Sequence, residues 1–356
     1  MNQEWITSFW NRIENKLSVI APLVETPYPY TTDDGGKLVS FRDETWWTNG
    51  FWAGMMWLAF KETKKTLYKD IAIASEKALD QAFLSFDGLH HDVGFMWLPS
   101  AVAHYCIDGN AESKTRGMHA ATLLAGRFNC MGEFIRAWNR DQLGWVIIDS
   151  MMNIPLLHWA HKETEDPRFY HIAVKHADTV MKNFVREDGS VHHIVELNPL
   201  TGQVVSIPIG QGYASGSSWS RGQAWAIYGF AVAYNYTQKT EYLDTAMKLL
   251  DKFMAESKGK VPAWDFRLPE FEEKALDTSA AAIVLCGIIE LEKHKTTLRL
   301  QKYKQMLRDS LEEYIDYDED VMGILREQNG RHHYTSYGDY FWIESFMKEN
   351  AEIQVW

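Results

Sequence analysis

Residues 50–79 read GFWAGMMWLAFKETKKTLYKDIAIASEKAL, and this stretch decides the fold class. Its first part is apolar nearly all round, a short Lys/Thr/Glu turn follows, and after Tyr68 comes a helix with one charged face. The same order recurs in IPLLHWAHKETEDPRFYHIAVKHADTVMKNF from Ile154 and in QAWAIYGFAVAYNYTQKTEYLDTAMKLLDKF from Gln223. Helices that are apolar all round lie inside a protein, and one-sided helices lie at its periphery. Each repeat therefore predicts an inner helix followed by an outer one.

The rest of the chain fits the same pattern. Helix pairs can be placed at 92–129 and 277–315, and a first helix at about 2–24 and a last one from about 338 complete six pairs. No long run of strict alternation predicts an extended sheet. We therefore predict an all-α fold, an (α/α)6 barrel built from six helical hairpins with parallel inner helices, in a single domain, 1–356. An open solenoid is the alternative, but it would need more regular repeats and polar caps.

Composition limits the classes of function. Hydrophobic residues make up 46% of the 356 residues, and no stretch is as long and uncharged as a membrane span. The net charge of −12 disfavours nucleic acid and anionic lipid as partners. Cys106, Cys130 and Cys286 match no metal or redox spacing, so we expect buried thiols in a reducing compartment, and a cytoplasmic protein. The 15 Trp, 16 Tyr and 17 Phe mostly predict core, and some of them predict surfaces on which sugars stack.

Two aspartates precede inner helices. Asp92 lies seven residues before Pro99, and Asp149 lies six residues before Pro155. Proline is tolerated in the first turn of a helix, so both aspartates precede or open an inner helix. Parallel inner helices would bring these starts to one rim of the barrel, together with WWTNGFW around Asn49 and the stretch that follows Gly216.

Helix capping is the plain explanation for such aspartates, because their side chains accept backbone N–H bonds. A catalytic role is the alternative, since each has a tryptophan within five positions, Trp97 and Trp145, and two such carboxylates share one predicted rim. The sequence alone leaves both explanations open.

Histidines occur as the adjacent pairs His90–His91, His192–His193 and His332–His333. Adjacent histidines project in different directions and no metal-binding spacing accompanies them, so we predict no metal site. One histidine of each pair would orient a carboxylate or a substrate hydroxyl.

The segment GSSWSRGQAWAIYGF, residues 216–230, places Arg221 among small residues and tryptophans. A guanidinium forms a planar fork that matches a carboxylate. Arg221 either pairs with an Asp or Glu of the protein or recognises an anionic sugar.

Together these motifs resemble those of the unsaturated glucuronyl hydrolases, glycoside hydrolase family 88. The resemblance runs from about Gln3 to about Ser345, through TNGFWAG, HHDVGF, VIIDSMMNIPLLHWA, GSSWSRGQAWAIYGF and AWDFRLPE. It implies an (α/α)6 barrel that needs no metal or organic cofactor. It also implies a substrate that ends in a Δ4,5-unsaturated uronic acid, as in glycosaminoglycan oligosaccharides released by polysaccharide lyases.

The resemblance also implies roles for individual residues. Asp149 matches the general acid/base of the family and Asp92 its second essential carboxylate. The residues that match substrate-contacting or aromatic-lining positions are His91, His193, Gln211, Arg221, Trp47, Trp138, Trp219 and Trp225.

The chain departs from the family pattern at Gly210 and Asn49. Its late segment REQNGRHHYTSYGDYF, residues 326–341, is shorter than the family's loop and lacks the Ser/Lys-rich pattern associated with sulfated substrates. Three alternatives stay open: an unsaturated rhamnogalacturonyl hydrolase that acts on pectin fragments, a sugar 2-epimerase that would depend on His193 or His333, and a non-catalytic carbohydrate-binding protein.

Overall fold

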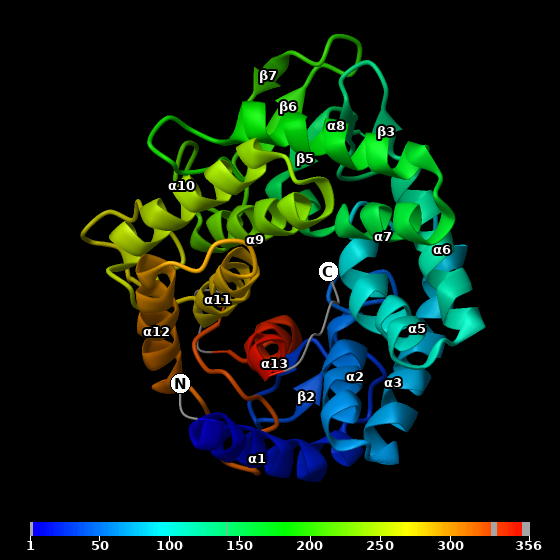
Figure 1. Ribbon diagram of the computed structural model, residues 1–356, viewed down its shortest axis with the longest axis vertical. Helices are drawn as coiled ribbons and strands as arrows, with labels where there is room; N and C mark the ends of the chain where they lie inside the picture. The colour runs from blue at the N-terminus through cyan, green and yellow to red at the C-terminus, as the bar shows by residue number, and fades with distance from the viewer. Residues whose placement is uncertain (1–2, 140, 329–332, 351–356) are drawn as a thin grey trace.

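The structure is a computed structural model that describes residues 3–139, 141–328 and 333–350. Across these residues the chain forms two concentric rings of helices, and Figure 1 lets the reader follow the ring by colour from α1 in blue to α13 in red. The inner helices are α2 (Phe51–Thr63), α4 (Val93–Trp97) continued by α5 (Ala103–Asp108), α7 (Pro155–Thr164), α9 (Ser220–Thr237), α11 (Thr278–Glu292) and α13 (Ser336–Asn350). The outer helices are α1 (Gln3–Ile20), α3 (Thr66–Ala78), α6 (Ala111–Ala125), α8 (Pro167–Phe184), α10 (Thr240–Ser257) and α12 (Leu298–Glu312).

The inner ring closes on itself. α13 packs against both α2 and α11, α9 packs against α11 and α7, and α4 packs against α7. The predicted (α/α)6 barrel is thereby confirmed, and the open solenoid is wrong. The last helix, α13, pairs with the first, α1, through rings such as Phe9 and Phe346, which stack with centroids 4.1 Å apart.

Burial separates the two rings as the sequence pattern predicts. Every residue of α11 except Glu292 is buried, whereas four of the 15 residues of α12 are. The apolar residues of the inner ring form one continuous core with the inward faces of the outer helices.

A recurrent threonine turn joins inner and outer helices. α2, α7 and α9 each end in a threonine, followed by a residue with left-handed backbone and by one linking residue. Each threonine hydroxyl donates to the carbonyl four residues earlier and accepts the backbone N–H two residues later, in Thr63, Thr164 and Thr237. These bonds provide partners for backbone groups that have none at the end of a helix, which explains why the Lys/Thr/Glu turn recurs in the sequence.

Proline behaves differently in the two inner helices that follow the aspartates. Pro155 opens α7, as predicted. Pro99 instead lies within its helix, in a π-helical segment, Leu98–Val102, between α4 and α5. Since proline has no N–H to donate, the α-helical ladder is interrupted there, and Ser100 Oγ donates to the Met96 carbonyl.

Short strands that the sequence did not reveal lie in the loops. They form the pairs β1 (Thr31–Thr32) with β2 (Leu38–Val39) and β3 (Phe128–Asn129) with β4 (Phe134–Ile135), and the sheet β5 (Trp145–Ile147), β6 (Ile194–Leu197) and β7 (Val204–Ser206). The three-stranded sheet is antiparallel, and Ile147 pairs with Ile194. It joins the segment before Asp149 to the segment after His193.

The expectation of three buried thiols is wrong for two of them. Cys106 and Cys130 are exposed and Cys286 is buried, and all three are free. Within the part of the chain that the structure describes, no helix is both long and apolar enough to span a membrane.

Candidate active site

The N-terminal ends of the inner helices meet at one rim, which confirms the predicted parallel arrangement. Asp92 immediately precedes α4, and Asp149 lies in a 3-10 turn, Ile148–Met152, just before α7. Both carboxylates line a cavity of about 310 Å³ together with Trp47, Trp138 and His193. The positive ends of several helix dipoles therefore point toward this rim, which favours a negatively charged ligand.

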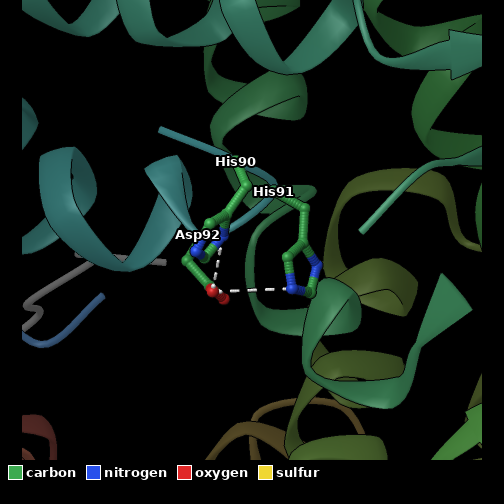
Figure 2. Close-up of side chains that lie close together, drawn as sticks. All are labelled: His90, His91 and Asp92. Atoms are coloured by element: carbon green, nitrogen blue, oxygen red, sulfur yellow. Dashed lines mark ion pairs between the residues drawn. The ribbon is translucent and has the colours of Figure 1, made fainter. Parts of the chain in front are cut away.

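Two histidines flank the Asp92 carboxylate, as Figure 2 shows. His90 Nδ1 lies 3.1 Å and His91 Nε2 3.5 Å from the same oxygen, Oδ2. The Asp92 side chain caps no helix, so the capping explanation fails for it. Burial alone would raise the pKa of Asp92, but His91 and His90 together hold it below its usual value. Asp92 is therefore a carboxylate at neutral pH. One histidine of the pair was predicted to lie beside a carboxylate or a substrate hydroxyl, and the structure places both beside Asp92.

His90, His91 and Asp92 are also the described side chains that come nearest to a metal-binding set, with ligand atoms within 4.8 Å of one another. Each imidazole approaches the shared oxygen at a distance close to that of a hydrogen bond, which accounts for the cluster without an ion. Burial lowers the pKa of His91 to about 4, so its ring is neutral at neutral pH. The absence of a metal stays a prediction.

Asp149 differs from Asp92 in its surroundings. The two side chains are almost equally exposed, at 13% for Asp149 and 12% for Asp92, but Asp149 Oδ2 lies 3.6 Å from His193 Nε2, too far for a hydrogen bond. This oxygen has no hydrogen-bond partner among the described residues. A buried carboxylate oxygen without a partner is costly, so this atom is the one best placed to bind or protonate a ligand.

Asn153 connects the two aspartates. Its Nδ2 donates to Asp92 Oδ1 over 3.3 Å and to the backbone carbonyl of Asp149 over 3.1 Å. Its Oδ1 accepts the N–H of Phe95, in the first turn of α4, over 2.8 Å. Gly94 allows this close packing, because a Cβ there would lie 2.4 Å from the Asn153 Cα. One fully buried amide thus ties the starts of α4 and α7 together.

His193 is fixed by the loop that carries Gln211. The Gln211 N–H donates to His193 Nδ1 over 2.7 Å, so in the neutral ring Nε2 carries the hydrogen and faces Asp149. Gly210 makes this approach feasible, because a Cβ there would lie 1.8 Å from Nδ1. The absence of a side chain at residue 210 is therefore necessary for this loop conformation.

Arg221 is buried at the start of α9 and is held on several sides. Its Nη1 pairs with Asp277 Oδ2 at 2.5 Å, and its Nη2 donates to Gln211 Oε1 at 3.0 Å. The guanidinium also lies 4.7 Å from the Trp219 ring centroid and 5.3 Å from that of Tyr337. Although burial would lower the pKa of Arg221, Tyr337 and Asp277 hold it above its usual value. The ion pair with an acidic residue, one of the two roles expected for Arg221, is confirmed, and it holds a permanent cation buried at the start of α9.

The tryptophans predicted to line the site take different positions. Trp47 and Trp138 line the cavity, and Trp138 packs against Trp145 with centroids 5.4 Å apart. Trp219 is 5% exposed and packs against His193. Trp225 is fully buried beneath Trp47, so it supports the lining and has no exposed surface for a ligand.

Several residues of the site were missed by sequence reasoning. They are Trp46, Asn153, Asp277 and Tyr337. Asp277 carried a usable signal, because it precedes an all-round apolar inner helix just as Asp92 and Asp149 do. Asn153 gave none, since an asparagine in an apolar segment can serve many purposes.

His333, from the third histidine pair, does not join this group. His333 is exposed and lines a separate cavity with Tyr30 and Arg42, and His332 lies outside the described residues. Residues 329–332 of the late segment are likewise not described. A larger cavity of about 600 Å³ adjoins the site through His90 and contains neither aspartate.

Enzymes that protonate sugars combine buried carboxylates with aromatic rings and fixed charges around a cavity. The barrel and its rim have this combination, which defines the class of protein as a glycoside hydrolase.

Comparison with known proteins gives the family. No protein-family model matches the chain. The unsaturated glucuronyl hydrolase of Bacillus sp. (strain GL1) is 31% identical over 345 residues, which cover 90% of each chain. The unsaturated chondroitin disaccharide hydrolase of Streptococcus pneumoniae is 32% identical over 342 residues, covering 90% of this chain and 85% of that protein.

Solved structures agree. The crystal structure of the Bacillus sp. GL1 unsaturated glucuronyl hydrolase, responsible for the degradation of glycosaminoglycan, matches with a TM-score of 0.89 at 30% identity, over 95% of this chain and 96% of that one. A second match is a Streptococcus agalactiae unsaturated glucuronyl hydrolase, an aspartate-to-asparagine mutant complexed with dGlcA-GalNAc6S. It matches with a TM-score of 0.82 at 26% identity, over 99% of this chain and 93% of that one. The chain belongs to the unsaturated glucuronyl hydrolase family, glycoside hydrolase family 88.

Proposed function

We propose that this protein releases the Δ4,5-unsaturated uronic acid from the non-reducing end of glycosaminoglycan oligosaccharides that polysaccharide lyases generate. The observation that carries the proposal is the unpartnered Oδ2 of Asp149, which lines the same cavity as the ionised Asp92. The activities and ligands named for the relatives support the same class of substrate.

The C4–C5 double bond of such a uronate is a vinyl ether. A protonated Asp149 gives its proton to C4, which leaves oxocarbenium character at C5. Water then attacks C5, and the Asp149 carboxylate accepts a proton from that water. The hemiketal opens, and the aglycone leaves as an alcohol. One carboxyl therefore makes both proton transfers, unlike the two carboxylates of ordinary glycoside hydrolysis.

The other side chains bind and orient the substrate. Asp92, held by His90 and His91, accepts hydrogen bonds from ring hydroxyls. The His193 Nε2–H faces Asp149 and can donate to a substrate atom that binds beside that carboxyl. Arg221 and Gln211 offer a cation and an amide on the same side, where the uronate carboxylate would lie.

The test measures ultraviolet absorbance of the conjugated uronate during incubation with unsaturated disaccharides from chondroitin, hyaluronan, heparin and pectin lyase digests. We expect absorbance to fall with at least one glycosaminoglycan disaccharide. Asp149→Asn should fold and bind but lose about 10²- to 10⁴-fold in turnover, the usual contribution of general acid/base catalysis. Asp166→Asn, which keeps a good helix cap far from the rim, is the matched control. Substantial activity in Asp149→Asn would refute the assignment of the acid/base.

The same panel separates the alternatives. Loss of absorbance with the pectin product alone would indicate an unsaturated rhamnogalacturonyl hydrolase. No loss with any product would bring back the 2-epimerase and the non-catalytic binding protein. The separation of His333 from His193 into different cavities speaks against an acid/base pair of these two histidines.

We also infer a single catalytic domain, 1–356, and a cytoplasmic location. The continuous core supports the first, and the three free cysteines suit a reducing compartment. Limited proteolysis and cell fractionation test these two inferences.

A further inference from the structure

His176 lies on the outer helix α8, away from the cavity, yet it is fully buried and both its ring nitrogens are engaged. Its Nδ1 accepts the N–H of Ile135 over 2.9 Å. Its Nε2 lies 2.7 Å from Ser150 Oγ. Ser150 is the residue that follows Asp149.

The directions of these bonds follow from the donors. A backbone N–H can only donate, so Nδ1 of His176 holds a lone pair and Nε2 carries the hydrogen. Nε2–H then donates to Ser150 Oγ, whose own hydrogen is donated to the Ile147 carbonyl over 2.6 Å. Burial lowers the pKa of His176 to about 3, which keeps the ring neutral and this chain of bonds intact at neutral pH.

Each end of the chain of bonds holds a part of the site. Ile147 immediately precedes the 3-10 turn that contains Asp149 and Ser150. Ile135 ends strand β4, and two residues later the Ala137 carbonyl accepts the N–H of His91 over 3.1 Å. Trp138, which lines the cavity, follows directly.

We propose that His176 is a positioning residue that fixes Asp149 relative to His91 and Trp138 through Ser150 and Ile135. The inference rests on the proposed function of Asp149 as acid/base. An apolar ring of similar size would fill the space but would leave the Ile135 N–H and the Ser150 hydroxyl without their partner. The Asp149 turn and the β4 segment would then move independently.

The experiment compares His176→Phe with two variants that each retain one bond. His176→Gln places an amide N–H near the original Nε2 and keeps the bond to Ser150, whereas His176→Asn places an amide oxygen near Nδ1 and keeps the bond to Ile135. His171→Gln, an exposed histidine on the same helix, is the control. We expect kcat to fall at least 10-fold in His176→Phe and His176→Asn with KM changed less than 3-fold. His176→Gln should recover most of kcat.

A loss of kcat that follows the folded fraction alone, with no recovery in His176→Gln, would overturn the proposal. Amide hydrogen exchange gives a readout that does not depend on activity. Peptides that cover 145–153 and 134–139 should exchange at least 10-fold faster in His176→Phe and at the wild-type rate in His171→Gln. Unchanged exchange in both peptides would also overturn it. If the wild-type protein hydrates no substrate in the panel, the proposed function fails, while the exchange result still decides whether His176 positions the turn.

Discussion

Replacing Asn153 by aspartate tests whether its amide holds Asp92 and Asp149 together. The substitution keeps the shape of the side chain and its acceptor for the Phe95 N–H, but it exchanges the donor to Asp92 for a carboxylate oxygen. The donor lies 3.3 Å from Asp92 Oδ1. Two negative charges at that spacing repel by about 5 kcal/mol at an effective dielectric constant of about 20. The new carboxyl will therefore retain a proton well above its usual pKa.

The sign of the pH dependence follows. A carboxyl whose folded pKa is raised binds its proton more tightly in the folded protein, so stability is retained below the unfolded value of about 4 and lost as pH rises toward the folded value. We expect Asn153→Asp to unfold with nearly the wild-type free energy at pH 4. At pH 8 its free energy of unfolding should be several kcal/mol lower than that of the wild type, because the two carboxylates then repel each other. The repulsion of about 5 kcal/mol is an upper estimate of this loss.

Urea denaturation of both proteins at pH 4, 6 and 8 measures this difference. Asn198→Asp, the same change in a half-buried turn, is the control: its new carboxylate would accept the N–H groups of Leu200 and Thr201, so it should not lose stability as pH rises. Activity of Asn153→Asp should also fall as pH rises, because a proton shared with Asp92 changes the charge beside the substrate. A stability difference of equal size at all three pH values would refute the reasoning, since it would mean that Asn153 does not contact Asp92.

Three further outcomes are expected. Gly210→Ala should raise KM, because the new Cβ would lie 1.8 Å from His193 Nδ1 and displace the loop. Steady-state kinetics measures the rise in KM, and circular dichroism shows whether the variant is still folded. Arg221→Lys should raise KM at least 10-fold and destabilise the protein by about 1–3 kcal/mol, because an ammonium cannot both bind Asp277 and stack on Trp219. Steady-state kinetics and thermal unfolding measure these two effects. The pKa of His91 is lowered to about 4, so the stability that its neutral ring contributes is present above pH 6.5 and lost as pH falls toward 4. The free energy of unfolding of His91→Gln should therefore vary less between pH 6.5 and 4 than that of the wild type.

The sequence predicts the barrel well because its signal is local and repeated. Three quoted segments share an inner helix, a threonine turn and an outer helix, and the turn forms the same bonds in Thr63, Thr164 and Thr237. The short strands escaped prediction, because two or three residues of pairing leave no periodicity. The rule that puts a proline in the first turn of a helix failed for Pro99, because a π-helical segment accommodates it within the helix, although Asp92 does immediately precede α4 as predicted.

The site was predictable in its members but not in its geometry. Asp92, Asp149 and Arg221 are recognisable as polar residues at the starts of inner helices. Which partner each one takes depends on side chains from distant segments, such as Asp277 for Arg221, 56 residues away in sequence. Trp225 shows the same limit, because a tryptophan near the rim can line the cavity or support the lining from below.

Asp92 and Asp149 look alike in sequence, and their difference in surroundings supports the proposal that Asp149 is the acid. Asp92 receives an imidazole on each side and an amide from Asn153, so its charge is satisfied and it stays ionised. Asp149 is held through its backbone and the neighbouring Ser150, while Oδ2 is left without a partner toward the cavity. A carboxyl that must gain and lose a proton in each cycle cannot be fixed by several donors, because they would hold it in the charged form. The protein therefore positions the acid through its main chain and leaves its side chain for the substrate.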